Sequence, residues 1–373
     1  MVELDAYIAS FDAEPGYLDW AAFGPLSPAV RAEAQADIEL LGSGRRSGIR
    51  LVRDHVRDAE ALVAELVGGD ASQVVLQPST TYGLMQAFYG IAGSVVMGRG
   101  EFPSLTVAAT RAADALGSLE VQWIEPEDGF VTVDAVRDAL TDETTCVAVS
   151  LVDFRTGYVA DLAALREAIG DRLLVVDAIQ GFGVVDADYT AADVVCGNGY
   201  KWLRAGRGTG FAWFGDRALE RIAPVLSGFA GTDGALPLDE VPPPSASANA
   251  FHVSHPDPLA AARLATALRE VRDVGVDRLA IELAERSADV IFVADRYEVP
   301  VVTPRDPARR AGIVTLAPAP ADVAPLAAAL SNHGLTVTVR QGLVRVAPHV
   351  GTGADTLRLF GDALAGFASA RVW

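Results

Sequence analysis

The chain has 373 residues and a mass of 39.1 kDa, enough for one large α/β domain and a smaller one. Its 30 basic and 49 acidic residues give a formal net charge of −19. No cluster of basic residues occurs in the chain, which excludes a nucleic-acid-binding surface. Cys146 and Cys196 lie in apolar runs without metal-ligand or disulfide spacing, so we expect buried thiols, no metal site and a cytoplasmic location.

The N-terminal part reads as an arm followed by two helices. Residues 1–30 have no regular period, and no run approaches the length of a signal sequence or membrane span, so we expect neither. Helices are predicted over about 28–41 and 49–67, separated by the glycine-rich stretch 42–48.

Strand and helix patterns then alternate, which is typical of a mostly parallel sheet with helices on both faces. Seven strands are predicted, over 74–76, 94–97, 121–124, 146–152, 173–177, 194–197 and 210–214. The intervening helices are predicted over 81–90, 105–116, 132–140 and 162–169.

A change of composition marks the boundary of a second domain. Residues 228–258 are rich in glycine and proline, which favours a loop. Beyond it the sequence predicts helices over 259–274, 276–293, 321–331 and 354–368 and short strands over 313–316, 336–339 and 343–346. We therefore predict an arm of residues 1–30 joining the small domain, a large domain of residues 31–250 and a small α+β domain of residues 251–373.

Two of the predicted strands end in side chains suited to a ligand, because open parallel sheets bind ligands at the carboxyl ends of their strands. Ser79, Thr80 and Thr81 open a helix after residues 74–76, and hydroxyls with free backbone N–H groups there suit a phosphate. An ordinary helix cap is the alternative. Phe102 follows the next strand, where its ring is available for stacking or belongs to the core.

Two further strands end in charged groups. Asp177 closes an apolar strand, where a carboxylate is costly without a cationic partner such as a protonated pyridine nitrogen. Capping of the next helix is the competing account. Lys201 lies one strand further on and is the only lysine in the chain. Unlike arginine, a lysine amine can lose its proton and form a Schiff base.

A Schiff-base lysine, a partner for a pyridine nitrogen, a stacking ring and a phosphate site together match the requirements of pyridoxal 5′-phosphate. With these residues the chain resembles the class V aminotransferase family of fold-type I enzymes, which includes cysteine desulfurases, isopenicillin N epimerase-like proteins and kynureninases. The resemblance runs from Tyr17 to about Leu364 and implies a large domain with a mostly parallel seven-stranded sheet and a smaller α+β C-terminal domain.

The resemblance implies a role for each cofactor residue. Asp177 binds the ring nitrogen, Gln180 lies near the ring hydroxyl, and Lys201 carries the cofactor as a Schiff base. Phe102 stacks on the ring. The implied phosphate contacts are Ser79, Thr80, Thr81 and Tyr200, together with Asn198 and His255, which stand where family members have other residues.

The C-terminal segment supplies the implied substrate contacts. Val344-Arg345-Val346-Ala347-Pro348-His349 resembles the family segment whose arginine grips the substrate carboxylate, so Arg345 is the predicted anchor and Arg340 a second candidate. The alternative is that Arg345 forms a structural salt bridge and does not bind substrate. The family also implies a homodimer, with His255 placed near the segment that reaches the partner subunit.

The implied activity is that of a pyridoxal phosphate-dependent enzyme acting on an α-amino acid, and we rank an aminotransferase first. A C–S or C–C lyase of the kynureninase or selenocysteine lyase kind, an epimerase and a non-catalytic binding protein of the same fold are the alternatives. Residues 197–373 contain no cysteine, which excludes the loop thiol of cysteine desulfurases.

Overall fold

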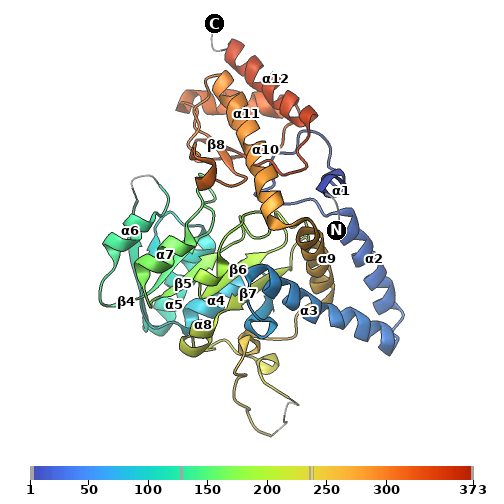
Figure 1. Cartoon of the computed structure of the whole chain (residues 1–373), viewed down its shortest axis with the longest axis vertical. Helices are drawn as coiled ribbons and strands as arrows, with labels where there is room; N and C mark the ends of the chain where they lie inside the picture. The colour runs from blue at the N-terminus through green and yellow to red at the C-terminus, as the bar shows by residue number, and fades with distance from the viewer. Residues whose placement is uncertain (1–3, 127–128, 235–236, 238, 371–373) are drawn as a thin grey trace.

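A seven-stranded sheet lies at the centre of the larger lobe in the computed structural model, which describes residues 4–126, 129–234, 237 and 239–370 (Figure 1). The strand order is β1-β7-β6-β5-β4-β2-β3, and β7 alone runs antiparallel to its two neighbours. The strands are β1 (Val74–Gln77), β2 (Gly93–Gly98), β3 (Leu119–Ile124), β4 (Thr144–Ser150), β5 (Leu173–Asp177), β6 (Val194–Asn198) and β7 (Gly210–Phe214). The predicted α/β fold with a mostly parallel seven-stranded sheet is confirmed.

The central strands are apolar on both faces because helices cover both. In β4, Val147 and Val149 belong to one hydrophobic core, whereas Cys146 and Ala148 belong to a second core on the other side of the sheet. Successive side chains of a strand point to opposite faces, so an uninterrupted apolar run serves both cores.

Helices flank this sheet, and all of them except α8 lie at predicted positions. They are α2 (Pro28–Gly42), α3 (Arg46–Val67), α4 (Thr80–Gly90), α5 (Pro103–Leu116), α6 (Val133–Ala139), α7 (Leu162–Ile169), α8 (Asp216–Arg221) and α9 (Pro258–Val274). Gly68 ends α3 in the left-handed conformation, with φ of 84°, as a residue without a side chain can do readily. Within the described residues, no helix has both the length and the apolar character needed to cross a bilayer.

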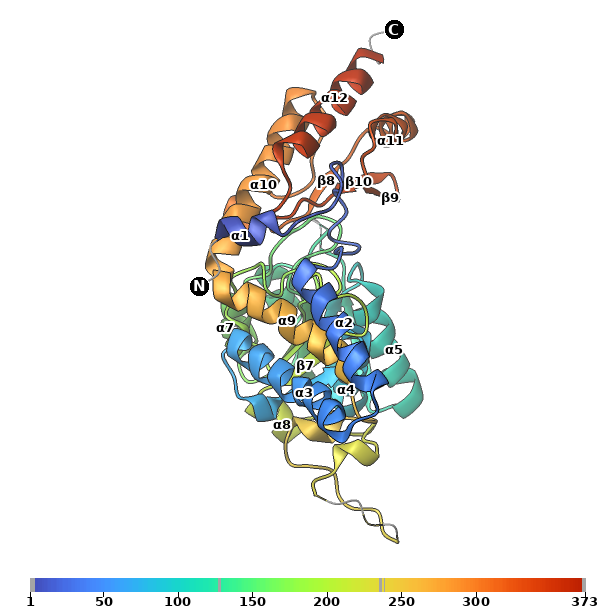
Figure 2. The same cartoon turned by 90° about the vertical axis from the view of Figure 1, so that its right-hand side faces the viewer.

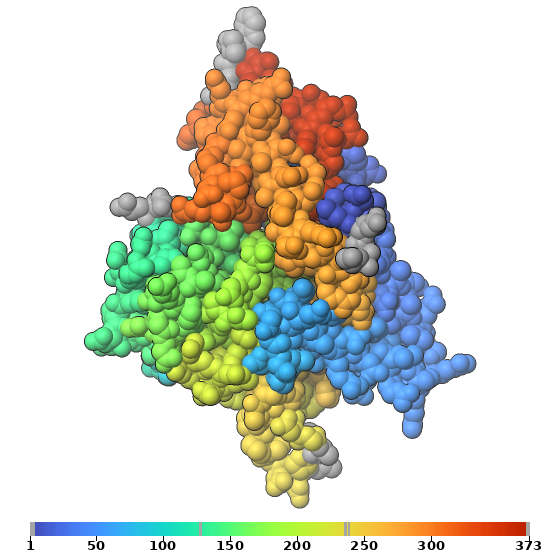
Figure 3. Space-filling view, in the orientation of Figure 1, coloured from blue at the N-terminus to red at the C-terminus, as the bar shows by residue number. Residues whose placement is uncertain are grey.

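The smaller lobe lies at one end of the molecule, where the orange and red C-terminal segments gather in Figures 1 and 3. It contains a three-stranded antiparallel sheet of order β8-β10-β9. Its elements are α10 (Val276–Arg296), β8 (Val314–Leu316), α11 (Val323–Asn332), β9 (Thr338–Arg340), β10 (Leu343–Val346) and α12 (Ala354–Ala370).

The N-terminal segment connects the two lobes. Residues 4–9, expected to be irregular, form the short helix α1 (Leu4–Ala9), which Figure 2 shows beside α10. Tyr17 and Asp19 then form bridges with Thr336 and Ala347 of the small lobe. Further on, the Gly24 N–H donates to the carbonyl of Tyr200 in the large lobe. This segment therefore contacts both sides of the cleft between the lobes.

The predicted division into residues 1–30, 31–250 and 251–373 stays a prediction, and residues 1–3 and 371–373 lie outside the described part. The long helix α9 packs against α2 and α3, and its Ala261, Leu264 and Leu268 belong to a core of the large sheet. The small-lobe core draws instead on α10, α11 and α12, together with Leu18 of the N-terminal segment.

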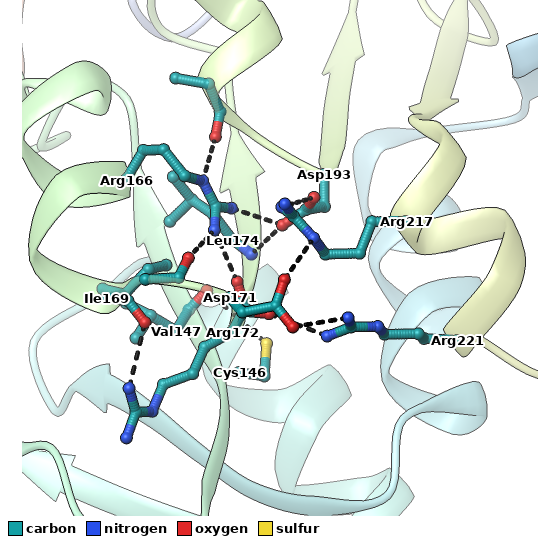
Figure 4. Close-up of polar contacts among 12 residues, drawn as sticks. Cys146, Val147, Arg166, Ile169, Asp171, Arg172, Leu174, Asp193, Arg217 and Arg221 are labelled. Atoms are coloured by element: carbon teal, nitrogen blue, oxygen red, sulfur yellow. Dashed lines mark hydrogen bonds and ion pairs between the residues drawn. The ribbon is translucent and has the colours of Figure 1, made fainter.

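An ion-pair network fixes the amino ends of β5 and β6. Figure 4 shows Asp193 between Arg166 and Arg217, whose nitrogens lie 2.5 and 2.8 Å from its two carboxylate oxygens. The Leu174 N–H also donates to Asp193 at 2.7 Å. A buried carboxylate with this many donors is fully compensated, so the network serves the fold.

Candidate active site

The carboxyl ends of the strands bring the predicted residues to one edge of the sheet. Asp177 is the last residue of β5, Asn198 the last of β6, and Lys201 follows in the next turn. Phe102 precedes α5 after the end of β2. Neighbouring parallel strands end side by side, so residues distant in sequence come together here.

Lys201 is buried, with 5% of its surface exposed. Its Nζ lies 5.7 Å from the centre of the Phe102 ring and 5.6 Å from that of Tyr200. Burial lowers the pKa of the Lys201 amine, and nearby Arg345 and Arg207 lower it further, whereas the Asp177 carboxylate opposes the shift. The amine is therefore far easier to deprotonate than that of a surface lysine.

Asp177 is buried more completely, with 2% exposed. Its Oδ1 accepts the Ile179 N–H at 3.1 Å, while its Oδ2 is buried and has no hydrogen-bond partner among the described residues. Burial raises the pKa of the Asp177 carboxyl, against the opposing charge of Lys201. A buried carboxylate oxygen without a donor is costly and is suited to a cationic or N–H group from a ligand.

The N-terminus of α4 carries the three predicted hydroxyls. The Ser79 Oγ accepts the Tyr82 N–H at 3.4 Å and caps the helix, and the Thr81 Oγ1 lies 2.9 Å from the Ser104 Oγ. The Thr80 Oγ1 is buried without a hydrogen-bond partner in the described structure. Ser79 is therefore an ordinary helix cap, whereas the Thr80 hydroxyl is available to a ligand.

The turn after β6 is held by Asn198. Its Oδ1 accepts from the Tyr200 N–H at 3.2 Å and from the Thr209 Oγ1 at 3.1 Å. These bonds fix the backbone immediately before Lys201. Asn198 thus positions the lysine turn through its side-chain oxygen.

A cavity of about 220 Å³ lies over Lys201 between the lobes. Six predicted residues line it, and they are Phe102, Gln180, Tyr200, Lys201, Arg340 and Arg345. The Gln180 amide is held in place because its Nε2 donates to the carbonyl of Ala21 and its Oε1 accepts from the Trp202 Nε1, both at 3.0 Å.

Arg345 enters the cavity from β10 of the small lobe. Its Nη2 lies 3.4 Å from the Asp19 Oδ1 and 3.3 Å from the Thr338 Oγ1, and its Nη1 donates to the Phe154 carbonyl at 3.3 Å. Burial lowers the pKa of the guanidinium and Asp19 opposes that shift. These contacts are long, so the guanidinium is oriented by them while its charge remains available to a carboxylate.

His255 lies apart from these residues. It lines a second pocket of about 480 Å³, together with Gln77, Tyr82 and Thr209, and none of the residues lining the Lys201 cavity lines it. The His255 side chain is exposed and its ring contacts that of Phe229 at 5.3 Å. Any contact of His255 with the cofactor of a partner subunit stays a prediction.

Phe154 and Arg155, which line the cavity, and Asp19, which contacts Arg345, were not assigned roles from the sequence. Phe154 packs edge-on against Phe102, with ring centres 5.1 Å apart, and Arg155 follows it in the loop after β4. Both residues follow the end of a predicted strand, and that position in the sequence could have indicated a place in the site. Asp19, which orients Arg345, is 326 residues away in sequence and carries no local signal.

The chain is similar to proteins of known activity. The family described as aminotransferase class-V matches residues 16–352. A kynureninase of Deinococcus radiodurans is 28% identical, over 82% of this chain and 79% of the kynureninase. The cysteine desulfurase IscS of Ectopseudomonas mendocina is 33% identical over 47% of this chain and 46% of the desulfurase, so that match spans about half of either protein.

Solved structures share the fold at lower identity. The apo cysteine desulfurase of Thermococcus onnurineus NA1 superposes with a TM-score of 0.86 at 20% identity, covering 99% of both chains. C-DES, with glycine covalently linked to its pyridoxal phosphate cofactor, gives a TM-score of 0.86 at 16% identity, covering 96% of this chain and 98% of that one. At such identities the likeness shows the fold.

The family match extends over nearly the whole chain and includes both lobes and every predicted site residue. It confirms the resemblance drawn from the strand-end motifs, and the structural neighbours confirm the fold-type I architecture. The chain belongs to the class V aminotransferase family and is a pyridoxal 5′-phosphate-dependent enzyme.

Proposed function

We propose that this enzyme binds an α-amino acid in the cavity between the lobes, with Lys201 as the catalytic amine, Asp177 as the partner of the cofactor ring and Arg345 as the carboxylate anchor. One observation carries the proposal. The only lysine of the chain is buried beside a carboxylate whose Oδ2 has no partner among the described residues, at a cavity that also holds an oriented arginine.

The residues present fit pyridoxal phosphate. The orphaned Oδ2 of Asp177 suits a protonated pyridine nitrogen, because that contact would relieve the cost of its burial. The unused Thr80 hydroxyl and the N–H groups of α4 suit a phosphate. The Phe102 ring lines the cavity, and its centre lies 5.7 Å from the Lys201 Nζ, where it can stack on the cofactor ring. When bound there, the cofactor supplies an electron sink for negative charge that develops at the substrate Cα.

The chain's own groups account for the proton transfer. Because its pKa is lowered to about 7, a large fraction of the Lys201 amine is neutral near pH 7, so its Nζ can accept the proton from Cα and later return it. Arg345 holds the α-carboxylate and thereby fixes the position of Cα relative to that amine. Gln180, held through both ends of its amide, keeps its place beside them.

Cleavage of a bond at the substrate β-carbon is the reaction class that we favour. Support comes from the kynureninase, a relative whose similarity extends over 82% of this chain. The desulfurase route of sulfur transfer through a loop thiol is excluded, because residues 197–373 contain no cysteine and both cysteines of the chain are buried. Transamination is the second candidate, supported by the aminotransferase class-V match.

An amino-acid panel separates these reactions. Enzyme loaded with pyridoxal phosphate is incubated with each amino acid, with and without an α-keto acid, and products are identified by mass. Release of a β-fragment without keto acid supports the lyase. Conversion of the cofactor to pyridoxamine phosphate, reversed by keto acid, indicates transamination. Loss of Cα stereochemistry with no other product indicates an epimerase. Arg345→Ala should raise KM for every accepted amino acid, and an unchanged KM would remove Arg345 from its proposed role.

The enzyme is further proposed to be a homodimer. Tyr82, Phe229 and Val253 expose 50%, 54% and 48% of their surfaces around the pocket that contains His255. Apolar side chains gathered beside a pocket are typical of a surface covered by another subunit. A partner seated there would lie against the N-terminus of α4 and hence near the proposed phosphate site.

The cytoplasm is the proposed location. Cys146 and Cys196 are both free and buried, and burial raises the pKa of both thiols. Unpaired cysteines are typical of proteins from reducing compartments.

A further inference from the structure

The cavity over Lys201 carries more positive charge than one carboxylate would balance. Arg155, Arg340 and Arg345 line it together with Lys201, and none of the described residues that line it is aspartate or glutamate. If Arg345 holds the α-carboxylate, the charges of the other two arginines need a separate explanation.

Arg155 is already engaged by the protein. Its Nη2 donates to the Gly129 carbonyl at 2.5 Å and lies 3.6 Å from the Asp153 Oδ2. Its backbone N–H also donates to Asp153 at 3.0 Å. The guanidinium is thus anchored to its own loop and partly neutralised.

Arg340 has no such partner. Its guanidinium makes no hydrogen bond or ion pair with any residue that the structure describes, and its central carbon lies 5.9 Å from the centre of the Phe154 ring. The side chain is exposed at the mouth of the cavity. A free guanidinium against an aromatic wall can take up an anion without breaking an existing pair.

The β9–β10 hairpin fixes Arg340 beside Arg345. Thr338 pairs with Arg345 and Arg340 pairs with Leu343, so all four side chains share one face of the small sheet, and all four line the cavity. Arg340 and Arg345 are therefore diagonal neighbours, a relation that places Cα atoms about 7–8 Å apart. The turn between them, with φ of 52° at Gln341 and 80° at Gly342, is a short hairpin turn matched to the strand twist.

Two cations on one face, aimed into one cavity, are matched by a ligand with two anionic groups a few bonds apart. We propose that Arg340 binds the side-chain carboxylate of the substrate, so that the preferred substrate is an amino dicarboxylic acid of the aspartate or glutamate type. This inference rests on the proposed function, which assigns the α-carboxylate to Arg345. It makes Arg340 a determinant of specificity.

The test compares each acid with its amide, because aspartate and asparagine, or glutamate and glutamine, differ in charge at nearly constant shape. With the pyridoxal phosphate-loaded enzyme, kcat/KM should favour one acid over its amide by about 10- to 100-fold, the effect of one charge-assisted hydrogen bond. Arg340→Gln should remove this preference mainly by raising KM for the acid. Arg340→Lys should keep part of it. The matched control is Arg358→Gln, which removes an equal charge from an exposed pair on α12 and should leave the preference intact.

The outcomes distinguish the two proposals. Equal kcat/KM for acid and amide in the native enzyme overturns the inference while leaving the proposed function in place. A preference for the acid that survives Arg340→Gln, or an equal loss for acid and amide in that variant, also overturns it. The cofactor absorbance of Arg340→Gln reports whether the variant is folded and loaded. If the native enzyme loads no cofactor or turns over no amino acid, the proposed function fails and the inference with it.

Discussion

Lys201 and Asp177 are ionisable side chains in the interior of the protein, and their environment decides which charges they carry. For each of them loss of solvent is the largest influence on the pKa, and the opposite charge of the other compensates only in part. Burial therefore outweighs the ion pair. The result is a lysine that loses its proton readily, which is the property required of a catalytic amine.

The first prediction concerns the reactivity of this amine. Burial lowers the pKa of Lys201 to about 7, from an ordinary value of 10.5. In cofactor-free protein, acylation of Lys201 by acetic anhydride should therefore rise with pH through a midpoint near 7, because only the neutral amine reacts. Mass spectrometry of the Lys201 peptide measures the rate without interference from the α-amino group.

Asp177→Asn supplies the matched variant. The Asp177 carboxylate raises the pKa of Lys201, so its removal should move the midpoint to lower pH. A midpoint near 10 in the native protein, or no change in the variant, would contradict the coupling of the two side chains.

Some residues of the site can be predicted from the sequence alone, and others cannot. Lys201 and Asp177 could be predicted because a unique amine and a carboxylate at the end of an apolar strand are visible locally. The pairing of Arg345 with Asp19 could not, since it joins positions 326 residues apart through the packing of the N-terminal segment on the small sheet. The orphaned oxygen of Asp177 likewise depends on its three-dimensional surroundings.

At the scale of elements, strands and long helices were predictable from their periods. All seven strands of the large sheet occur where apolar runs predicted them. The helices α1 and α8, of six residues each, were missed because so short a segment contains less than two full turns of pattern. The antiparallel direction of β7 follows from a tight connection after Lys201 that hydropathy does not encode.

The N-terminal segment yields the second prediction, because it packs tightly on the lysine turn. A Cβ at Gly24 would lie 1.9 Å from the carbonyl oxygen of Lys201. Gly24→Ala should therefore displace the segment or the turn, weaken pyridoxal phosphate binding and lower the free energy of unfolding by about 1–3 kcal/mol. Urea denaturation and cofactor titration measure the two effects.

Gly42→Ala is the control for that substitution, because a Cβ at Gly42 would meet nothing within 4 Å. Its free energy of unfolding should stay within about 1 kcal/mol of the native value. If the two variants behave alike, the segment does not constrain the lysine turn.

At the scale of the whole molecule, the third prediction is a dimer. Light scattering at micromolar concentration should give twice the 39.1 kDa mass of one chain. Tyr82→Glu should shift the mass toward that of the monomer and weaken cofactor binding, because a buried unpaired charge opposes association. Phe292→Glu, at a still more exposed aromatic residue on α10, is the control and should leave the dimer intact. A fully active monomer would refute the proposal.

The two-lobed architecture places Lys201 on one side of a cavity and Arg340 and Arg345 on the other. The central claim is that this cavity binds pyridoxal phosphate through Lys201. Borohydride reduction of the loaded enzyme, followed by proteolysis and peptide mass spectrometry, tests it most directly. We predict one modified peptide, carrying the reduced cofactor on Lys201, and no covalently attached cofactor in Lys201→Ala. Cofactor mass on another residue, its absence from the native protein, or a covalently modified peptide in the variant would contradict the assignment.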